Sequence, residues 1–396
     1  MFRKMPFILL LIAVLIILLD DLISLQIYQT LYAISLTIKS LIICVLPFII
    51  FGLLFRAAIN LSHNATRIIS LILICVCCSS FLALFLSHFI GEWVYKFNLS
   101  IFLPENTKGL DAAWVFEFPK FISNDKAMFA GIILGILTSW NKLSIINKFL
   151  IKTSLKLEWL ISKFFKFFIY LIPLFVAGFI AKLQYDGVVC MLIKDYTLIF
   201  VVIVLAEFLY LLLAYFCINK FKIKQLLISL KNLLPAAISG FSTMSSAASM
   251  PLTIVGAENN AKFKDLVRSV IPATVNIHLV GDCFTTPILA YAILKNYSMA
   301  QPFLLDYVNF AFYFIVAKFS VAAIPGGGII VMLPILESYL GFNADMLSLI
   351  TALYILFDPV NTCVNILGNG AFAKMIDNVV YYLSKKRPSS WYGFQK

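Results

Sequence analysis

The stretch ILFDPVNTCVNILGNG, residues 355–370, sets four polar side chains in a run that is otherwise apolar. In an α-helix, which turns about 100° per residue, Asp358, Asn361, Asn365 and Asn369 would lie within roughly 80° of one another. A polar side chain surrounded by lipid is costly, so such a stripe must face protein or water. The stretch therefore predicts a buried helix whose polar face is turned toward other helices.

The composition of the whole chain indicates a membrane protein. Of its 396 residues, 62% are hydrophobic and 13% are charged, whereas soluble proteins average roughly 45–50% and about 25%. Apolar runs such as residues 8–19, 41–54 and 196–218 recur along the sequence. A bilayer span needs about 20 mostly apolar residues. We therefore expect a polytopic helical protein rather than a soluble domain with a single anchor.

The first half of the chain divides into apolar spans separated by charged connections. The expected spans are residues 5–28, 35–60, 67–91, 127–140, 162–184 and 195–218. Lysine clusters at 142–166, 220–231 and 385–396 carry much of the net charge of +12. Basic loops face the cytoplasm, which predicts cytoplasmic N- and C-termini. No basic stripe lies on a soluble domain, so no nucleic-acid partner is expected.

Cysteine usage gives no sign of a cofactor. The eight cysteines lie mostly inside apolar runs, where thiols behave as small hydrophobic groups. The cluster of Cys75, Cys77 and Cys78 could suggest a metal site, but no partner His or Cys follows at ligand spacing. The apolar N-terminal segment has no small-x-small cleavage site before Asp20 and is expected to be a retained span. We expect no cofactor.

After residue 224 the apolar segments are interrupted in a regular way. STMSSAASMPLT, residues 242–253, breaks one apolar region, and AAIPGGGIIVMLP, residues 322–334, breaks another. Each flanking arm is too short to cross the membrane alone, and irregular backbone at membrane depth requires burial in protein or contact with water. The order hairpin, span, hairpin, span predicts two repeated units, 226–295 and 303–383, with two re-entrant hairpins. Broken segments at corresponding positions point to a transporter's binding site.

Polar residues also lie in the middle of the seventh span, expected at residues 270–295. The motif PATVNIHLVGDC contains Thr274, Asn276, His278 and Asp282. On a continuous helix His278 and Asp282 would share one face at i and i+4. The eighth span carries the stripe at 355–370. Both full spans of this region therefore offer polar groups to one site.

These motifs together resemble the dicarboxylate/amino acid:cation symporters, the glutamate transporter family. The resemblance covers most of the chain and rests on SMPLT at the first hairpin, TVN in the seventh span, IPGGG at the second hairpin and D-x-x-x-T-x-x-N in the eighth. It implies an all-α polytopic membrane protein with about eight transmembrane helices and two re-entrant hairpins in an inverted-repeat transporter fold. It also implies a homotrimer and a cation-coupled symporter of amino acids or dicarboxylates that works by alternating access.

The resemblance further implies an organisation of the chain. Residues 1–224 would form scaffold and peripheral spans, with spans three and six travelling with the transport core. Residues 225–384 would form that core, and 385–396 a basic cytoplasmic tail. The protein would lie in a bacterial inner membrane, surrounded by lipid. The implied ligand of the core is a small-molecule substrate.

Residue by residue, the family pattern assigns most of a site. Ser245 and Ser246 fall where a serine cluster holds the substrate carboxylate, and Asp358 falls where an acid holds its amino group. Asn365 falls where an asparagine binds both substrate and ion. The remaining substrate positions are Asn361, Thr362, Ile324, Pro325 and Gly326. The positions for a coupling cation or proton are Ser79, Ser80, Thr274, Asn276, His278, Asp282, Asn365 and Asn369.

Several positions depart from the family pattern. His278 and Asn369 stand where the family has cation-binding aspartates, and Asn361 stands where an arginine pairs with acidic substrates. Val321 and Lys318 replace hydroxyl residues before the second hairpin's tip. Neutral groups replace carboxylates poorly around a sodium ion, which leaves a sodium site uncertain. We expect proton coupling through His278 with Asp282 as its partner, or altered sodium coupling. His278 could alternatively only pack against neighbouring helices.

The same departures bear on the substrate and on rival functions. Without the arginine, a neutral amino acid or another small polar solute should fit better than glutamate, unless His278 or Lys318 supplies the positive charge. Asn361→Arg should then raise affinity for acidic substrates.

A further alternative is that this protein is a divergent family member that conducts ions or binds partners without coupled transport. An enzyme is not expected, because H-E-x-x-H and G-x-S-x-G are absent and only three histidines occur. Glu207, an acid inside the sixth span, is expected to have a structural role.

Overall fold

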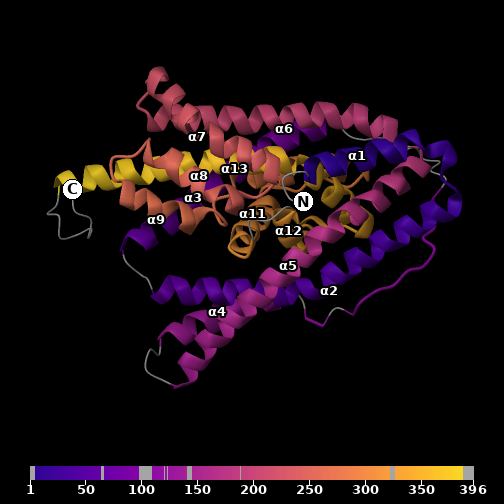
Figure 1. Cartoon of the computed structure of the whole chain (residues 1–396), viewed down its shortest axis with the longest axis horizontal. Coiled ribbons are helices and arrows are strands. Elements are labelled where there is room, and N and C mark those ends of the chain that lie inside the picture. The colour runs from indigo at the N-terminus through magenta and orange to yellow at the C-terminus, as the bar shows by residue number, and fades with distance from the viewer. Residues whose placement is uncertain are drawn as a thin grey trace.

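The computed structural model describes residues 5–63, 67–97, 109–119, 121–122, 124–140, 145–187, 189–321 and 326–386. Within these ranges the chain forms helices and no strand, as the sequence predicts. Helix α13 (Ala344–Lys386) runs lengthwise through the molecule (Figure 1). The fold is therefore an all-helical bundle.

One group of helices, here called the outer helices, packs chiefly within itself. Helices α4 and α5 both lie against α2, and α1 lies against α5; Figure 1 shows α5 crossing α2 obliquely. An extended segment, residues 109–119, runs along α2, where Ala113 N–H donates to the Gln29 carbonyl at 3.1 Å. The outer helices are α1 (Met5–Leu18), α2 (Leu25–His63), α4 (Asn124–Trp140) and α5 (Ile145–Tyr185).

Two boundaries among the outer helices differ from the sequence prediction. The apolar pattern predicts a first span that runs to residue 28, but α1 ends at Leu18 and α2 begins at Leu25. Asp20 forms a short 3-10 turn there and accepts a hydrogen bond from the Tyr28 hydroxyl at 2.5 Å. The lysine-rich connection before the fifth span is helical from Ile145, because Lys, Leu and Glu are good helix formers.

A second group, here called the core helices, surrounds α13 and α10. Helix α10 packs on α3, α13 and α6, and α13 packs on α7, α8, α6 and α12. The residues of α10 from Val280 to Leu294 are all buried. The core helices are α3 (Arg67–Lys96), α6 (Val189–Ile218), α7 (Ile223–Thr243), α8 (Ser246–Glu258), α9 (Lys264–Thr274), α10 (Val280–Asn296), α11 (Leu304–Lys318), α12 (Gly327–Leu340) and α13 (Ala344–Lys386).

Both interruptions predicted in the second half are helix–break–helix units. Helices α7 and α8 are separated by Met244, which adopts a left-handed conformation at φ 52°, and by Ser245, the N-cap of α8. Helices α11 and α12 are separated around Gly326, at φ 69°, a backbone conformation that glycine adopts without steric cost. The two arms of each unit pack against each other. Whether either unit enters and leaves one side of a membrane stays a prediction.

The seventh span is not the continuous helix that the sequence predicts. Helix α9 ends at Thr274, and α10 begins only at Val280. A turn closes the gap, in which the backbone N–H of His278 donates to the Thr274 carbonyl at 2.8 Å. Consecutive β-branched residues and an asparagine favour helix weakly. This break, residues 275–279, buries Val275, His278 and Leu279 and leaves Asn276 exposed.

Four helices of the described chain are long and apolar enough to cross a membrane: Leu71–Lys96, Thr197–Ile218, Ile223–Thr243 and Asp345–Ser384. The fourth differs from the others, because 83% of its most apolar window is buried inside the protein, against 22% to 39% for the other three. The helix that carries the polar stripe is therefore shielded by protein. The expected total of about eight spans stays a prediction.

Candidate functional site

The four stripe residues of α13 are buried together in the core. Asp358 and Asn365 are each 5% exposed, Asn369 is 1% exposed and Asn361 is fully buried. Their shared helical face is turned toward α10 and toward the break between α11 and α12. The period read from the sequence therefore predicts the orientation of α13 correctly.

Asp358 connects the stripe to the second break. The backbone N–H of Gly326 donates to Asp358 Oδ2 at 2.7 Å. On the next turn, the Thr362 hydroxyl makes a long contact of 3.5 Å to Asp358 Oδ1. No lysine, arginine or histidine among the described residues forms a salt bridge with this carboxylate. Among the described residues, the printed hydrogen-bond partners of Asp358 are thus a backbone N–H and a hydroxyl group.

The first break reaches the same part of α13. A Cβ atom on Gly240, in α7, would lie 3.1 Å from Thr362 Cγ2, so α7 and α13 touch closely there. Met244, at the break itself, packs in one cluster with Ile330 of α12 and Ile355 of α13. Both breaks therefore converge on the stretch of α13 that contains Asp358.

A second carboxylate, Asp282, lies in the first turn of α10 and is held by neutral donors. The Tyr354 hydroxyl donates to Asp282 Oδ1 at 2.6 Å, and Asn365 Nδ2 approaches the same oxygen at 3.4 Å. Asn365 also accepts from the backbone N–H of Gly281 at 2.8 Å. The positive end of the α10 dipole favours an acid at this position. Asn365 therefore joins the stripe to the N-terminus of α10.

Asn361 belongs to a third network, which includes an acid from α6. The Thr285 hydroxyl lies 2.6 Å from Asn361 Oδ1 and 2.8 Å from Glu207 Oε1. Glu207 is fully buried, and its Oε2 has no hydrogen-bond partner. Asn361 Nδ2 is likewise buried without a partner. The Thr285 hydroxyl thus bridges the neutral Asn361 amide and the buried Glu207 carboxyl group.

His278 is paired differently from the sequence prediction. Its Nε2 lies 3.0 Å from the Ser79 hydroxyl, and its ring packs on Phe372 at 4.5 Å between centroids. Its backbone carbonyl accepts from Asn369 Nδ2 at 3.1 Å. The expected His278–Asp282 pair is absent from the hydrogen bonds of the described residues, because the i, i+4 relation assumed an unbroken helix. Asp282 bonds to Tyr354 instead.

A cavity of about 300 Å³ borders His278. It lies between α3, α6 and α13 and is mostly apolar, with Ser79 and Tyr210 as its other polar lining. The Nδ1 atom of His278 is buried without a hydrogen-bond partner. The imidazole therefore has one nitrogen engaged and one nitrogen available to a proton or a small ligand.

Lys318 ends α11 with its side chain turned into the core, where it is 1% exposed. Its ammonium group donates to the Leu279 carbonyl at 2.8 Å, to Cys283 Sγ at 2.9 Å and to the Ser80 hydroxyl at 3.3 Å. An ammonium has three donors, and all three are used. Lys318 is therefore not free to supply charge to an acidic substrate.

The other predicted residues divide between the site and its surroundings. Ser246 and Thr274 are buried, and Ser245 is half-buried and accepts from the Ala248 N–H at 3.2 Å. Asn276 is exposed. Ile324 and Pro325 lie outside the described residues. Within the described ranges no three His, Cys, Asp or Glu side chains gather closely enough to hold a metal ion.

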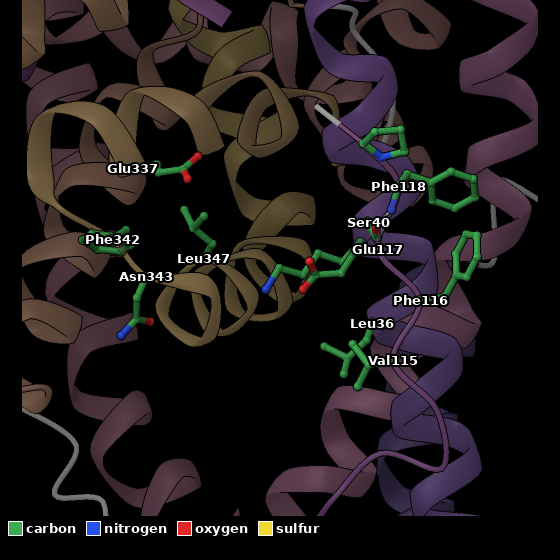
Figure 2. A pocket seen from close by; sticks show the side chains of 12 residues that line it. Leu36, Ser40, Val115, Phe116, Glu117, Phe118, Glu337, Phe342, Asn343 and Leu347 are labelled. Atoms are coloured by element: carbon green, nitrogen blue, oxygen red, sulfur yellow. Dashed lines mark hydrogen bonds between the residues drawn. The ribbon is translucent and has the colours of Figure 1, made fainter. Parts of the chain in front are cut away.

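A second cavity lies away from these networks. It has a volume of about 530 Å³ and separates α2 and the 115–119 segment from the turn between α12 and α13. Figure 2 shows Glu337 and Leu347 on one wall, and Ser40 and Glu117 on the other. Lys39 crosses the divide to donate to the Ser348 hydroxyl at 2.7 Å. The cavity marks the boundary between outer and core helices, not the predicted binding site.

The sequence did not predict the parts played by Thr285 and Tyr354. Both contact predicted residues through hydroxyl groups, but single Thr and Tyr residues in apolar helices carry no spacing signal. Glu207 is visible in the sequence only as an acid inside a span. Its place beside Thr285 is a tertiary contact between α6 and α10.

Comparison with known proteins gives a consistent result. The profile of the sodium:dicarboxylate symporter family matches residues 7–379. The chain is similar to Excitatory amino acid transporter 1 of Ambystoma tigrinum, with 28% identity over 208 residues, covering 52% of this chain and 37% of that protein. The corresponding Homo sapiens protein is 27% identical over 214 residues, covering 54% and 39%. Excitatory amino acid transporter of Onchocerca volvulus is 27% identical over 157 residues, covering 39% and 31%.

Proposed function

The chain belongs to the sodium:dicarboxylate symporter family, a family of transporters and not enzymes, and from this premise we propose that it is a secondary active transporter of a neutral amino acid or a similar small amine-bearing solute. It is an integral membrane protein. Its matches span about two fifths of the length of the named relatives, so substrate and coupling are proposed from this chain's own residues.

The observation that carries the proposal is the environment of Asp358. A buried carboxylate without a cationic partner is costly, and the described groups that contact it are a backbone N–H and a hydroxyl. A substrate ammonium group would offset that cost. The bond from Gly326 to Asp358 would have to open and re-form around the substrate, which makes the second break the moving gate. Ser245 and Ser246 would hold the substrate carboxylate.

A neutral substrate follows from the charges near Asn361. The amide offers hydrogen bonds without positive charge, Glu207 adds a carboxyl group nearby, and Lys318 has its donors engaged. A second substrate carboxylate would meet no cation there and would lose the bidentate pairing that a guanidinium provides. We therefore place neutral amino acids ahead of glutamate and dicarboxylates.

Coupling is best tested in proteoliposomes with the sodium and proton gradients imposed separately. We expect substrate-dependent uptake against a gradient, driven by an inward proton gradient. Uptake that follows sodium and ignores the pH gradient would refute proton coupling while leaving transport intact. Ion conductance, or substrate binding without concentrative uptake, would instead indicate that this protein has lost coupled transport.

The proposed proton carrier is His278, because its imidazole Nδ1 is buried without a hydrogen-bond partner beside a cavity. Ser79 is its hydrogen-bond partner, Phe372 packs on it and Lys318 is the charged group acting on it. His278→Gln should retain a hydrogen bond to Ser79 but lose the response of uptake to the pH gradient. The measurement is initial uptake rate at several imposed pH differences. An unchanged response in His278→Gln would mean that the ring only packs.

The substrate prediction for Asn361 is sharpened by Glu207. Asn361→Arg alone should raise affinity for aspartate or glutamate little, because the guanidinium would pair with the neighbouring Glu207 carboxylate. Asn361→Arg combined with Glu207→Gln should raise it about tenfold or more, since a charge-assisted bidentate pair is worth at least about 1.4 kcal/mol. Competition of labelled neutral substrate by acidic amino acids measures this, with Glu207→Gln alone as control. No gain in the double variant would contradict the site assignment.

The remaining proposals concern organisation. We propose that α3 and α6 move with the core, supported by the packing of α3 on α10 and α11 and of α6 on α13. A homotrimer and a bacterial inner membrane rest on the family resemblance, and cytoplasmic termini rest on the lysine distribution. Crosslinking in native membranes and labelling of terminal tags from each side test these.

A further inference from the structure

Lys318 is a buried charge without a countercharge in contact. Its side chain is 1% exposed, yet no carboxylate of the described chain forms a salt bridge with it. Buried lysines are rare unless they are paired. The ammonium is surrounded instead by a carbonyl, a hydroxyl and a thiol, contributed by Leu279, Ser80 and Cys283. These are neutral groups that present lone pairs to one point.

That arrangement has the character of a monovalent cation site. Leu279 belongs to the break between α9 and α10, and carbonyls of unwound membrane helices are the groups that transporters use to hold a coupling cation. Ser80 adds a hydroxyl from α3, and Cys283 adds a thiol from the first turn of α10. Helix α3 and the start of α10, residues 279–283, thus supply the ligands, and α11 supplies the cation.

We propose that the Lys318 ammonium is a built-in cation of the transport cycle, held in a site formed by Ser80, the Leu279 carbonyl and Cys283. A carrier with a mobile cation in such a site must capture the ion from solution in each cycle, whereas here the cation is covalently part of the chain. The inference rests on the proposed transport function, which it deepens. It means that the chain needs one fewer cation from solution.

The contacts of the Lys318 ammonium also link α11 to α3 and α10. Lys318 is the last residue of α11, the helix that leads into the second break, and Gly326 beyond that break bonds to Asp358. The ammonium fastens the base of this gate to α3 and α10. The gate would therefore hinge on a fixed point instead of closing only when a mobile ion arrives.

Removing the tethered charge while leaving room for a mobile ion tests the proposal. Lys318→Ala opens space in the site, and Lys318→Met, the matched control, fills it with an uncharged side chain of similar length. The thermal midpoint Tm of purified wild type and both variants is measured in sodium chloride, methylammonium chloride or choline chloride at equal ionic strength. Because Tm does not require transport, its outcome is separate from success or failure of the proposed function.

We expect Lys318→Ala to have a lower Tm than wild type in choline, and to gain a saturable rise in Tm with sodium or methylammonium that wild type and Lys318→Met lack. Uptake by Lys318→Ala should fall about tenfold or more in choline, because a buried charge interaction is worth at least about 1.4 kcal/mol, and should recover with the same cations. If Lys318→Ala folds poorly, Lys318→Ser replaces it, because the serine hydroxyl can itself ligate a cation. The same rise in Tm and the same recovery of uptake with sodium or methylammonium are expected. Equal cation responses of Tm in all variants would overturn the proposal.

Discussion

Asp358→Asn should abolish concentrative uptake, lowering its initial rate at least about 100-fold, while the protein still folds. The substituted amide keeps the size of the side chain and can still accept a hydrogen bond from the Gly326 N–H, which lies 2.7 Å from the carboxylate. It cannot offer a negative charge to a substrate ammonium group, and breaking a buried ion pair costs about 3–5 kcal/mol. Substrate binding by calorimetry and uptake in proteoliposomes measure the loss.

Asp377→Asn is the matched control, because Asp377 is also a buried acid on α13. Its oxygens accept from the backbone N–H groups of Lys262 and Phe263 at 2.9 and 2.8 Å, which ties α13 to the start of α9. We expect this variant to lower Tm while substrate affinity is unchanged. Equal losses of affinity in both variants would show that Asp358 acts only through stability, and would contradict its role as the amine partner.

The orientation of α13 was predictable because it depends on a local quantity. Helical period alone places Asp358, Asn361, Asn365 and Asn369 on one face, and burial of all four confirms it. The interruptions after Thr243 and before Gly327 were predictable in the same way, from Ser, Pro and Gly clusters in short apolar arms. Backbone chemistry over a few residues decides each of these features.

The pairing of the site residues was not predictable, because it depends on contacts between distant segments. The sequence pattern pairs Asp282 with His278, but the break at residues 275–279 rotates them apart, and Ser79 from α3 takes the imidazole. Lys318 is visible in the sequence only as a departure from a family position. Its three acceptors come from α3 and from the start of α10, neither close to it in sequence. Such contacts become visible only when the core is assembled.

Gly328→Ala should lower uptake strongly, although alanine is the better helix former by about 1 kcal/mol. Gly328 lies in the first turn of α12, and a Cβ there would sit 2.7 Å from Asp282 Oδ2 and closer still to the Tyr354 hydroxyl. The added methyl would have to displace the Tyr354–Asp282 hydrogen bond of 2.6 Å. Overpacking of this kind costs about 1–3 kcal/mol, which corresponds to roughly 5- to 150-fold in rate or affinity.

A double-mutant cycle with Tyr354→Phe separates this clash from a general loss of packing. Tyr354→Phe removes the hydroxyl that the new methyl group would meet, so Gly328→Ala should cost less in the Tyr354→Phe background than in wild type. A coupling of about 1 kcal/mol or more is expected for groups in direct contact, measured from uptake rates of the four proteins. Additive effects would mean that the gate formed by the second break does not close against the Tyr354–Asp282 pair. A large coupling would instead show that α12, α10 and α13 must fit together at this point for each cycle, which makes the close approach permitted by Gly328 a requirement of transport.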